Sequence, residues 1–402
     1  MKYVILVPDG AADYPVDELD GRTPLQAAST PTMDRLAREG SGGLVQMIPD
    51  SRHPGSDVGN LEIFGYDSTR HYTGRAPLEA VSMGIDLSHG AIAYRCNLIY
   101  QDGDKLMDYS AGHVTTEEAR ELIEEVDTRL GTEQIRFFPG VSYRHIMRFQ
   151  GGPEGLEEYP PHDIMGESAS AHLPRGERQE EIRALMERAK PILKASETNK
   201  KRLAAGQVPA NAIWLWGAGR ALTLESVQQR YGLQAGVISA VDLIRGIGTC
   251  AGYEVIDVPG VTGYLDTNYE GKAQYALDAL RNGKDLLYVH VEAPDEAGHN
   301  ADIEGKVQAI EDFDSRVAAP ILEGLMGIGE PGRILMTPDH RTPLAIRTHT
   351  REPVPFVLWG EGVGTDEMDV YAEDAAEAGG LFPQAGHELI EALVRGPQTI
   401  DN

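Results

Sequence analysis

The chain has 402 residues, of which 41% are hydrophobic and 25% charged, with a formal net charge of -27 at pH 7. This composition is typical of a globular protein long enough to bury the cores of two domains. Such a charge repels nucleic acid backbones and anionic lipid, which argues against both as main partners and favours a small-molecule substrate. If that substrate is an anion, cations at the site must overcome the field of the protein.

No segment of the sequence predicts export or a membrane anchor. The chain starts with a strand-like run, KYVILV, without a basic region or cleavage site, and no apolar stretch approaches the length of about eighteen residues that a membrane helix needs. We therefore expect a cytoplasmic protein. Cys96 and Cys250 lie far apart and lack CxxC spacing, so neither a disulfide framework nor a thiolate metal site is expected. The sequence does not indicate an oligomeric state.

Strand-like and helical patterns alternate along most of the chain. Residues 30–40 predict a helix bounded by Pro31 and Gly40, and residues 304–325 place apolar side chains on one helical face. Short apolar runs predict buried parallel strands at residues 3–7, 213–216, 236–240, 254–258, 286–291, 333–337 and 356–359. This alternation predicts an α/β fold with a doubly wound, mostly parallel sheet.

Residues 92–168 break this rhythm. Strand-like segments on either side of TTEEARELIEEVDTRL predict a hairpin, a helix and a second hairpin. We therefore expect a small inserted α+β domain at 92–168, acting as a lid, in a core made of residues 1–91 and 169–402. The charged stretch 169–208 is interpreted as a solvated helix that returns to the core.

Three of the expected strands are followed directly by residues of the kinds that bind metals. These residues are Asp9, Asp295, His299, Asp339, His340 and His349. Because ligands collect at the carboxyl ends of strands in open α/β sheets, we expect the six side chains to meet. A single Asp after a strand is usually a turn or cap residue, but the agreement of three strand ends favours a metal site.

Ser56 is the candidate nucleophile, in the segment RHPGSDVGNLEIFGYD. It precedes a helix-like stretch whose N-terminal amides favour a phosphate or a developing negative charge. A serine before a helix is also the commonest N-cap, so the motif alone leaves both interpretations open. The metal site favours the nucleophile, because a metal-bound hydroxyl loses its proton more readily and needs no histidine base.

The chain resembles the archaeal-type, cofactor-independent phosphoglycerate mutases, a branch of the alkaline phosphatase superfamily. The resemblance runs nearly end to end, through VPDGAADYP, HPGSDVGNLEIFGYD, YTGRAPLEAVSMGI, SAVDLIRGIG, GYLDTNYEGKA and HVEAPDEAGH. It implies an α/β core of the alkaline phosphatase type. It also implies interconversion of 3-phosphoglycerate and 2-phosphoglycerate, a step of glycolysis and gluconeogenesis, through a phosphoserine intermediate.

The same resemblance assigns roles to the candidate residues. Ser56 would carry the phosphoryl group. One of two divalent cations would be held by Asp9, Ser56, Asp339 and His340, and the other by Asp295, His299 and His349. Manganese or magnesium is expected, although mixed Asp and His ligands also suit zinc or cobalt.

Further residues are expected to act on the substrate. Lys272, in NYEGKA, matches a position where the family places a cation near the phosphate, so we expect a catalytic role for it. Substrate carboxylate and phosphate need bidentate donors, and Arg144 and Arg148 would share one face of a strand. The remaining substrate-binding candidates are Arg245, His113 and Asp163. Each residue is also compatible with a surface or capping role.

Three positions depart from the family's usual pattern. Pro338 stands before the Asp-His pair in place of a small residue, Arg341 stands after it in place of Ser or Thr, and Gly59 replaces a common Ala. Arg341 would either add a phosphate contact or reshape the pocket. PDHRTP and IWLWGAG resemble a bacterial branch proposed to act on homoserine. The alternatives to a mutase are therefore a homoserine phosphotransferase or related metal-dependent phosphohydrolase, and a non-catalytic metal-binding scaffold.

Overall fold

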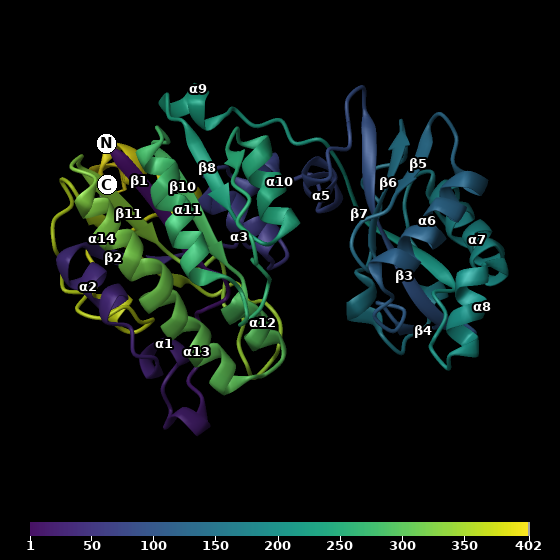
Figure 1. Ribbon diagram of the computed structural model, residues 1–402, viewed down its shortest axis with the longest axis horizontal. Helices are drawn as coiled ribbons and strands as arrows, with labels where there is room; N and C mark the ends of the chain where they lie inside the picture. The colour runs from purple at the N-terminus through teal and green to yellow at the C-terminus, as the bar shows by residue number, and fades with distance from the viewer. Residues whose placement is uncertain (401–402) are drawn as a thin grey trace. The chain divides into compact units, whose positions relative to one another are not determined.

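The computed structural model describes residues 1–400, and the chain divides into two compact units (Figure 1). Unit 1 combines Met1–Tyr72 with Thr223–Asn402, and unit 2 is Thr73–Leu222. The insertion expected at 92–168 lies inside unit 2, which extends beyond it at both ends. The flanking segments belong to unit 2 because the helices and the strand that they form pack on its sheet, so the boundaries differ from those expected.

Unit 1 is built on a seven-stranded sheet with the strand order β2-β12-β11-β1-β10-β8-β9. The strands are β1 (Lys2–Pro8), β2 (Ser41–Val45), β8 (Ala235–Ile238), β9 (Glu254–Val255), β10 (Leu286–Val291), β11 (Gly332–Met336) and β12 (Val354–Gly360). From β11 to β9 every neighbouring pair is parallel, whereas β12 and β2 are added antiparallel. This mostly parallel sheet confirms the predicted fold class.

Two predicted strands differ from expectation. Residues 356–359 lie in β12, which runs antiparallel to β11, and residues 213–216 lie in the sheet of unit 2. The prediction that both belong to a parallel sheet is therefore wrong. A short, wholly apolar run is typical of any strand covered on both faces, so composition alone does not reveal its direction or its sheet.

Helices cover the sheet of unit 1. All seven residues of β1 and all six of β10 are buried, as expected for strands with helices on both faces. The α-helices are α1 (Pro24–Ala27), α2 (Pro31–Glu39), α3 (Ser56–Ile63), α4 (Ser68–His71), α9 (Val227–Tyr231), α10 (Asp242–Cys250), α11 (Tyr269–Arg281), α12 (Ala293–His299), α13 (Ile303–Phe313), α14 (Ala319–Gly327) and α15 (Leu389–Arg395). Within residues 1–400, no helix is both long and apolar enough to span a bilayer.

The two helices predicted for unit 1 are both present. α2 begins at Pro31 and is capped by Gly40, as predicted. The helix predicted at 304–325 consists of α13 and α14, which are joined by a π-helical turn at Asp314–Ala318. The wider turn rotates the following residues, so the apolar stripe is not strictly regular along the helix.

Unit 2 contains a second sheet, in which every pairing is antiparallel. Its strands are β3 (Ala91–Asp102), β4 (Lys105–Asp108), β5 (Ile135–Phe138), β6 (Arg144–Gln150) and β7 (Ala212–Arg220). Its α-helices are α5 (Ala76–Ser82), α6 (Thr116–Leu130), α7 (Gln179–Ala195) and α8 (Glu197–Ala204). The predicted order of hairpin, helix and hairpin is confirmed by β3–β4, α6 and β5–β6.

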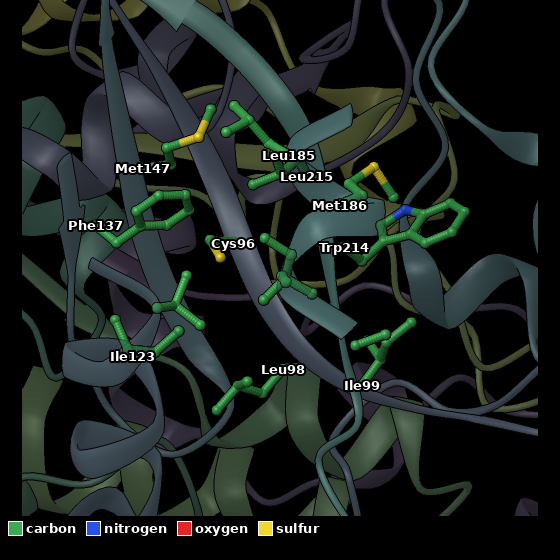
Figure 2. Packing of buried hydrophobic residues seen from close by; sticks show 14 of the residues in the cluster. Cys96, Leu98, Ile99, Ile123, Phe137, Met147, Leu185, Met186, Trp214 and Leu215 are labelled. Carbon is green, nitrogen blue, oxygen red and sulfur yellow. The ribbon is translucent and has the colours of Figure 1, made fainter. Parts of the chain in front are cut away.

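The core of unit 2 lies between its sheet and the helices α6 and α7 (Figure 2). Ile123 of α6 and Leu185 of α7 pack in one cluster with Cys96 of β3 and Trp214 of β7. The sequence suggested that residues 169–208 return to the core of unit 1. This prediction is wrong, because these residues belong to unit 2. The apolar side of α7 is buried within unit 2. Because charged residues alternate with the apolar ones along this helix, its buried side is hard to recognise in the sequence.

Candidate active site

Three adjacent strands of unit 1 bring the predicted metal ligands to one edge of the sheet. β1 lies between β10 and β11, and all three are parallel. Asp9 follows β1, Asp339 and His340 follow β11, and Asp295 and His299 lie on α12, directly after β10. One turn of α12 places Asp295 and His299 on the same side, as their spacing predicts.

The first ligand group contains Asp9, Asp339 and His340, and Ser56 lies beside it. The Nε2 atom of His340 is 3.1 Å from the Oγ atom of Ser56. The same nitrogen is 3.2 Å from Asp339 Oδ2 and 3.6 Å from Asp9 Oδ1. All four residues are buried, and Ser56 is the first residue of α3. The candidate nucleophile thus lies at a helix N-terminus and against the candidate ligands.

The second ligand group contains Asp295, His299 and His349. The Nε2 atoms of the two histidines are 3.0 Å apart, and the carboxylate of Asp295 lies 3.3 Å from one and 3.5 Å from the other. The Nδ1 atom of His299 lies 2.9 Å from the carbonyl oxygen of Arg347, so in neutral His299 the proton is on Nδ1 and Nε2 has its lone pair free. The rings of His340 and His349 are 4.1 Å apart between centroids, so the two groups are adjacent.

The carboxylates of this region repel one another. Burial raises the pKa of Asp9 well above its usual range, and the neighbouring Asp339 raises it further. Burial also raises the pKa values of Asp339 and Glu292. Burial acts in the same direction on Asp295, but hydrogen bonds to the two histidines of its group outweigh it and lower its pKa. A divalent cation would remove the repulsion among these buried anions.

Both groups have a geometry that fits a divalent cation. Metal–ligand bonds of about 2.0–2.2 Å place neighbouring ligand atoms about 3–3.5 Å apart. The distances of 3.0–3.6 Å within the groups lie close to this range. In the first group, Asp9 Oδ1 is buried and has no hydrogen-bond partner among residues 1–400. This oxygen is therefore available to an ion.

Sequence analysis did not identify Asn60, which connects the candidate nucleophile to a candidate ligand. Its amide nitrogen donates to the carbonyl oxygen of Ser56 at 2.9 Å and to Asp339 Oδ2 at 2.7 Å. Its amide oxygen accepts from the hydroxyl of Tyr288 on β10 at 2.6 Å. Asn60 lies one turn after Ser56 on α3, so inspection of that helix face would have indicated it.

His290 and Glu292 form a third group with Asp9, and neither was predicted. His290 Nε2 is 2.8 Å from Asp9 Oδ2, and its Nδ1 is 3.1 Å from Ser239 Oγ. Burial lowers the pKa of His290 to about 3, so the ring is neutral. A neutral ring that faces a carboxylate must donate to it, so Nε2 has the proton and Nδ1 accepts from Ser239. His290 therefore orients Asp9 and offers no lone pair to a metal on that side.

The profile of the 2,3-bisphosphoglycerate-independent phosphoglycerate mutase family matches residues 37–199. A probable enzyme of this name from Geobacter sulfurreducens is 50% identical over 399 residues, which cover 98% of this chain and 100% of that protein. The enzyme of this name from Methanosarcina mazei is 49% identical over 398 residues, with the same coverage. The chain belongs to this family.

Solved structures extend the likeness to the whole fold. A protein from Pyrococcus horikoshii has a TM-score of 0.83 and 28% identity, covering 99% of this chain and 97% of that one. A cofactor-independent phosphoglycerate mutase from Thermoplasma acidophilum has a TM-score of 0.67 and 26% identity, covering 98% of this chain and 99% of that one. The family relationship therefore includes both units.

Two of the positions that depart from the family's pattern have a structural explanation. The guanidinium of Arg341 donates to the carbonyl oxygen of Pro353 at 2.8 and 3.0 Å and to that of Asp13 at 3.1 Å. These bonds to the main chain occupy Arg341, so it shapes the loop. A Cβ atom on Gly59 would lie 2.4 Å from the carbonyl oxygen of Asp339, so the glycine allows α3 to approach the ligands closely.

Lys272 and Arg245 lie in unit 1 with partners of their own. Lys272, on α11, has no exposed surface, and its Nζ donates to the carbonyl oxygen of His290 at 2.7 Å. Burial lowers its pKa to about 8, and Glu292 opposes that effect. The Lys272 ammonium therefore interacts favourably with the carboxylate of Glu292. Arg245, on α10, pairs with the exposed Asp257 at 2.7 Å.

Arg144 and Arg148, the other two arginines predicted to bind substrate, lie in unit 2. Arg144 and Arg148 share one face of β6, as predicted, and Arg95 of β3 lies opposite the residue midway between them. Arg95 is buried, pairs with Glu79 at 2.9 Å and stacks 4.5 Å above the ring of Trp216. The antiparallel register therefore brings three arginines to one face of the sheet. Sequence analysis did not identify Arg95, which is 49 positions from Arg144 in the printed sequence.

The last two candidates, His113 and Asp163, are exposed in unit 2. His113 has a positive φ of 50°, and its backbone nitrogen donates to Ser110 Oγ at 3.1 Å. Asp163 lies 3.6 Å from the ring of His162, which contacts Trp216 edge-on. Their role in substrate binding stays a prediction.

Proposed function

We propose that this protein interconverts 3-phosphoglycerate and 2-phosphoglycerate without added 2,3-bisphosphoglycerate, through a phosphorylated Ser56. One observation carries the proposal: Ser56 begins α3, with its Oγ 3.1 Å from His340. The proposal is supported by relatives of this name that align with nearly the whole chain.

Two divalent cations complete the proposed site. Asp9, Ser56, Asp339 and His340 would hold one, and Asp295, His299 and His349 the other. When bound, such ions lower the pKa of a serine hydroxyl and neutralise phosphoryl oxygens. Manganese or magnesium is our first choice, and zinc or cobalt also suits these ligands.

The reaction consists of two phosphoryl transfers. In the first, a bond forms between Ser56 Oγ and phosphorus, the bond to the 3-oxygen of glycerate breaks, and that oxygen gains the proton that Ser56 loses. Glycerate then turns within the site. In the second, its 2-oxygen bonds to phosphorus and gives up its proton, and Ser56 Oγ leaves and regains a proton. Both transfers use the same serine, so no second phosphate donor is needed.

The residues of the chain support these transfers by position. The N-terminus of α3 favours the phosphoryl oxygens through its helix dipole, and Asn60 holds this helix to Asp339. His290 keeps Asp9 oriented. Arg144 and Arg148 are the proposed donors to the carboxylate or phosphate of the substrate, and unit 2 has the proposed role of the lid.

Ser56→Ala tests this function. With Mn²⁺ and 3-phosphoglycerate, phosphorus NMR should detect 2-phosphoglycerate from the wild type, and mass spectrometry should detect phosphate on residue 56. Ser56→Ala should give neither product. Ser68→Ala is the matched control, since Ser68 is also a buried serine at the first position of a helix and should leave turnover unchanged.

Adding homoserine to the same assay tests the alternative. Formation of phosphohomoserine, or release of inorganic phosphate without 2-phosphoglycerate, would replace the mutase with a phosphotransferase or a phosphohydrolase. No turnover with any divalent metal, and no phosphoserine, would support a non-catalytic scaffold.

A further inference from the structure

The hydroxyl of Thr342 lies between the two ligand groups. Its Oγ1 atom is 2.5 Å from Asp295 Oδ1 and 3.2 Å from His340 Nδ1. Asp295 belongs to the second ligand group and His340 to the first. Thr342 is completely buried, so water does not compete for either contact. One side chain therefore connects a ligand of each proposed cation.

The directions of these hydrogen bonds follow from the chemistry of the groups. A threonine hydroxyl has one proton, and a carboxylate accepts but does not donate. Thr342 therefore donates to Asp295, and its oxygen accepts from His340. The proton of a neutral His340 ring is then held on Nδ1. The lone pair on Nε2 points toward Ser56 Oγ and Asp339 Oδ2, which lie 3.1 and 3.2 Å away.

The surrounding main chain fixes Thr342 in place. Its backbone nitrogen donates to the carbonyl oxygen of Ala12 at 3.3 Å, and its carbonyl oxygen accepts from the buried Lys306 Nζ at 2.8 Å. A Cβ atom on Gly298 would lie 2.5 Å from this carbonyl oxygen, so α12 packs directly on the residue. A Cβ atom on Gly10 would lie 2.5 Å from Oγ1. The hydroxyl is therefore confined between the loops that carry the ligands.

We infer that Thr342 is a positioning residue that couples the two cation sites. Asp295, when it holds a cation, would be fixed in place and would fix with it the direction of the Thr342 hydroxyl. The hydroxyl would then favour the His340 tautomer that has its proton on Nδ1. In this tautomer the lone pair of Nε2 is free for the second cation. Binding at either site should therefore strengthen binding at the other. The inference rests on the two-cation site of the proposed function, but not on the identity of the substrate.

Stepwise binding of Mn²⁺ to the metal-free protein tests the coupling, with free Mn²⁺ measured by electron paramagnetic resonance. In the wild type, the second ion should bind more tightly than independent sites allow, by a factor within the usual range of about 5–150. Thr342→Val keeps the shape but removes the hydroxyl. We expect both affinities to fall, by about 10–100-fold as is usual for residues that orient ligands, and the coupling factor to approach one.

Two variants control for the loss of a buried hydroxyl. Thr342→Ser keeps the hydroxyl and should restore most of the coupling. Thr23→Val removes a comparable buried hydrogen bond, from Thr23 Oγ1 to Glu373 Oε2 at 2.7 Å, without touching a ligand group. It should lower stability but leave both Mn²⁺ affinities unchanged. Equal coupling in the wild type and in Thr342→Val would overturn the inference.

Nitrogen NMR of ¹⁵N-histidine protein provides a readout without metal or substrate. Metal-free wild type should show His340 with its proton on Nδ1, and Thr342→Val should show a mixture of the two tautomers. A proton on Nε2 in the wild type would overturn the role of Thr342 even if the variant fails to fold. A wild type that binds no divalent cation but shows the expected tautomer would instead overturn the proposed function and leave the hydrogen-bond assignment intact.

Discussion

The two units differ in whether the buried charges at their candidate sites have a counterion within the protein. At the sheet edge of unit 1, the carboxylates of Asp9 and Asp339 lie together; burial raises the pKa of both, and Asp339 raises the pKa of Asp9 further. On the sheet face of unit 2, the buried Arg95 already has Glu79 as its counterion. Unpaired buried anions require added cations, whereas a paired arginine does not. The buried carboxylates of unit 1 therefore favour the proposed metal ions, whereas the buried charge of Arg95 in unit 2 is balanced within the protein.

The largest effect is expected from a substitution in the carboxylate cluster of unit 1. Asp9→Asn removes one of the clustered carboxylates and should lower mutase activity by about 1000-fold or more, because the proposed ion beside Ser56 would lose a ligand. Metal analysis of the dialysed protein should show one bound ion fewer. Asp314→Asn is the control, since Asp314 is a buried carboxylate that accepts from Met33 N at 2.7 Å, away from the histidines. Unchanged metal content in Asp9→Asn would contradict the assignment.

Removing the counterion of Arg95 tests whether the buried charge of unit 2 depends on its partner. Glu79→Gln leaves the guanidinium of Arg95 buried without a negative partner, which should lower the free energy of unfolding by about 3 kcal/mol. Urea unfolding followed by circular dichroism measures the change. Glu270→Gln serves as the control, because its pair with Arg316 is exposed and should contribute less than about 1 kcal/mol. Equal losses in both variants would refute the contrast between buried and exposed pairs.

The sheet face of unit 2 that carries Arg95, Arg144 and Arg148 can be tested by enzyme kinetics. Arg148→Gln removes a donor whose Nε is buried without a hydrogen-bond partner within residues 1–400. If that donor binds the substrate, its loss should raise KM about tenfold, the effect of roughly 1.4 kcal/mol, and change kcat less. Arg129→Gln, on the exposed side of α6, should change neither constant. A fall in kcat at constant KM would point to a role in the transition state instead.

The smallest expected effect concerns a carboxylate of unit 1 that already has a partner. Glu62 accepts from His387 Nδ1 at 2.6 Å, and this bond raises the pKa of His387. The stability that it contributes is fully present below the unfolded-state pKa of about 6.5 and is lost as the pH rises through the raised value. After allowance for partial exposure, the contribution is about 1 kcal/mol.

Thermal unfolding of the wild type and His387→Gln between pH 5.5 and 9 measures this contribution. The two proteins should differ most at the acidic end and converge at the alkaline end. Chelation of divalent metal should not alter the difference, because Glu62 is paired within the protein. A difference that grows with pH would contradict the assigned sign.

The candidate ligands were easier to locate in the sequence than the sheet that carries them. Asp9, Asp295 and Asp339 each follow an apolar run. The end of such a run is a local signal, so it can be recognised even when the pairing of the strands is predicted wrongly. The sheet of residues 213–216 was assigned wrongly, because strand pairing depends on partners far away in the chain. Asn60 and Thr342 were not recognised for a similar reason. Their importance comes from atoms 279 and 47 positions away, which no local pattern contains.

The sequence by itself determined the α/β class, the chemical types of the candidate ligands and of the candidate nucleophile, and the family. These follow from side-chain chemistry and from short-range periodicity, which the order of residues contains directly. Only the tertiary structure decided that Thr342 connects the two ligand groups, that His290 orients Asp9, and that Arg95 joins Arg144 and Arg148. Each of these depends on distances of a few ångströms between distant segments, and such distances exist only once the strands have paired and the loops have packed.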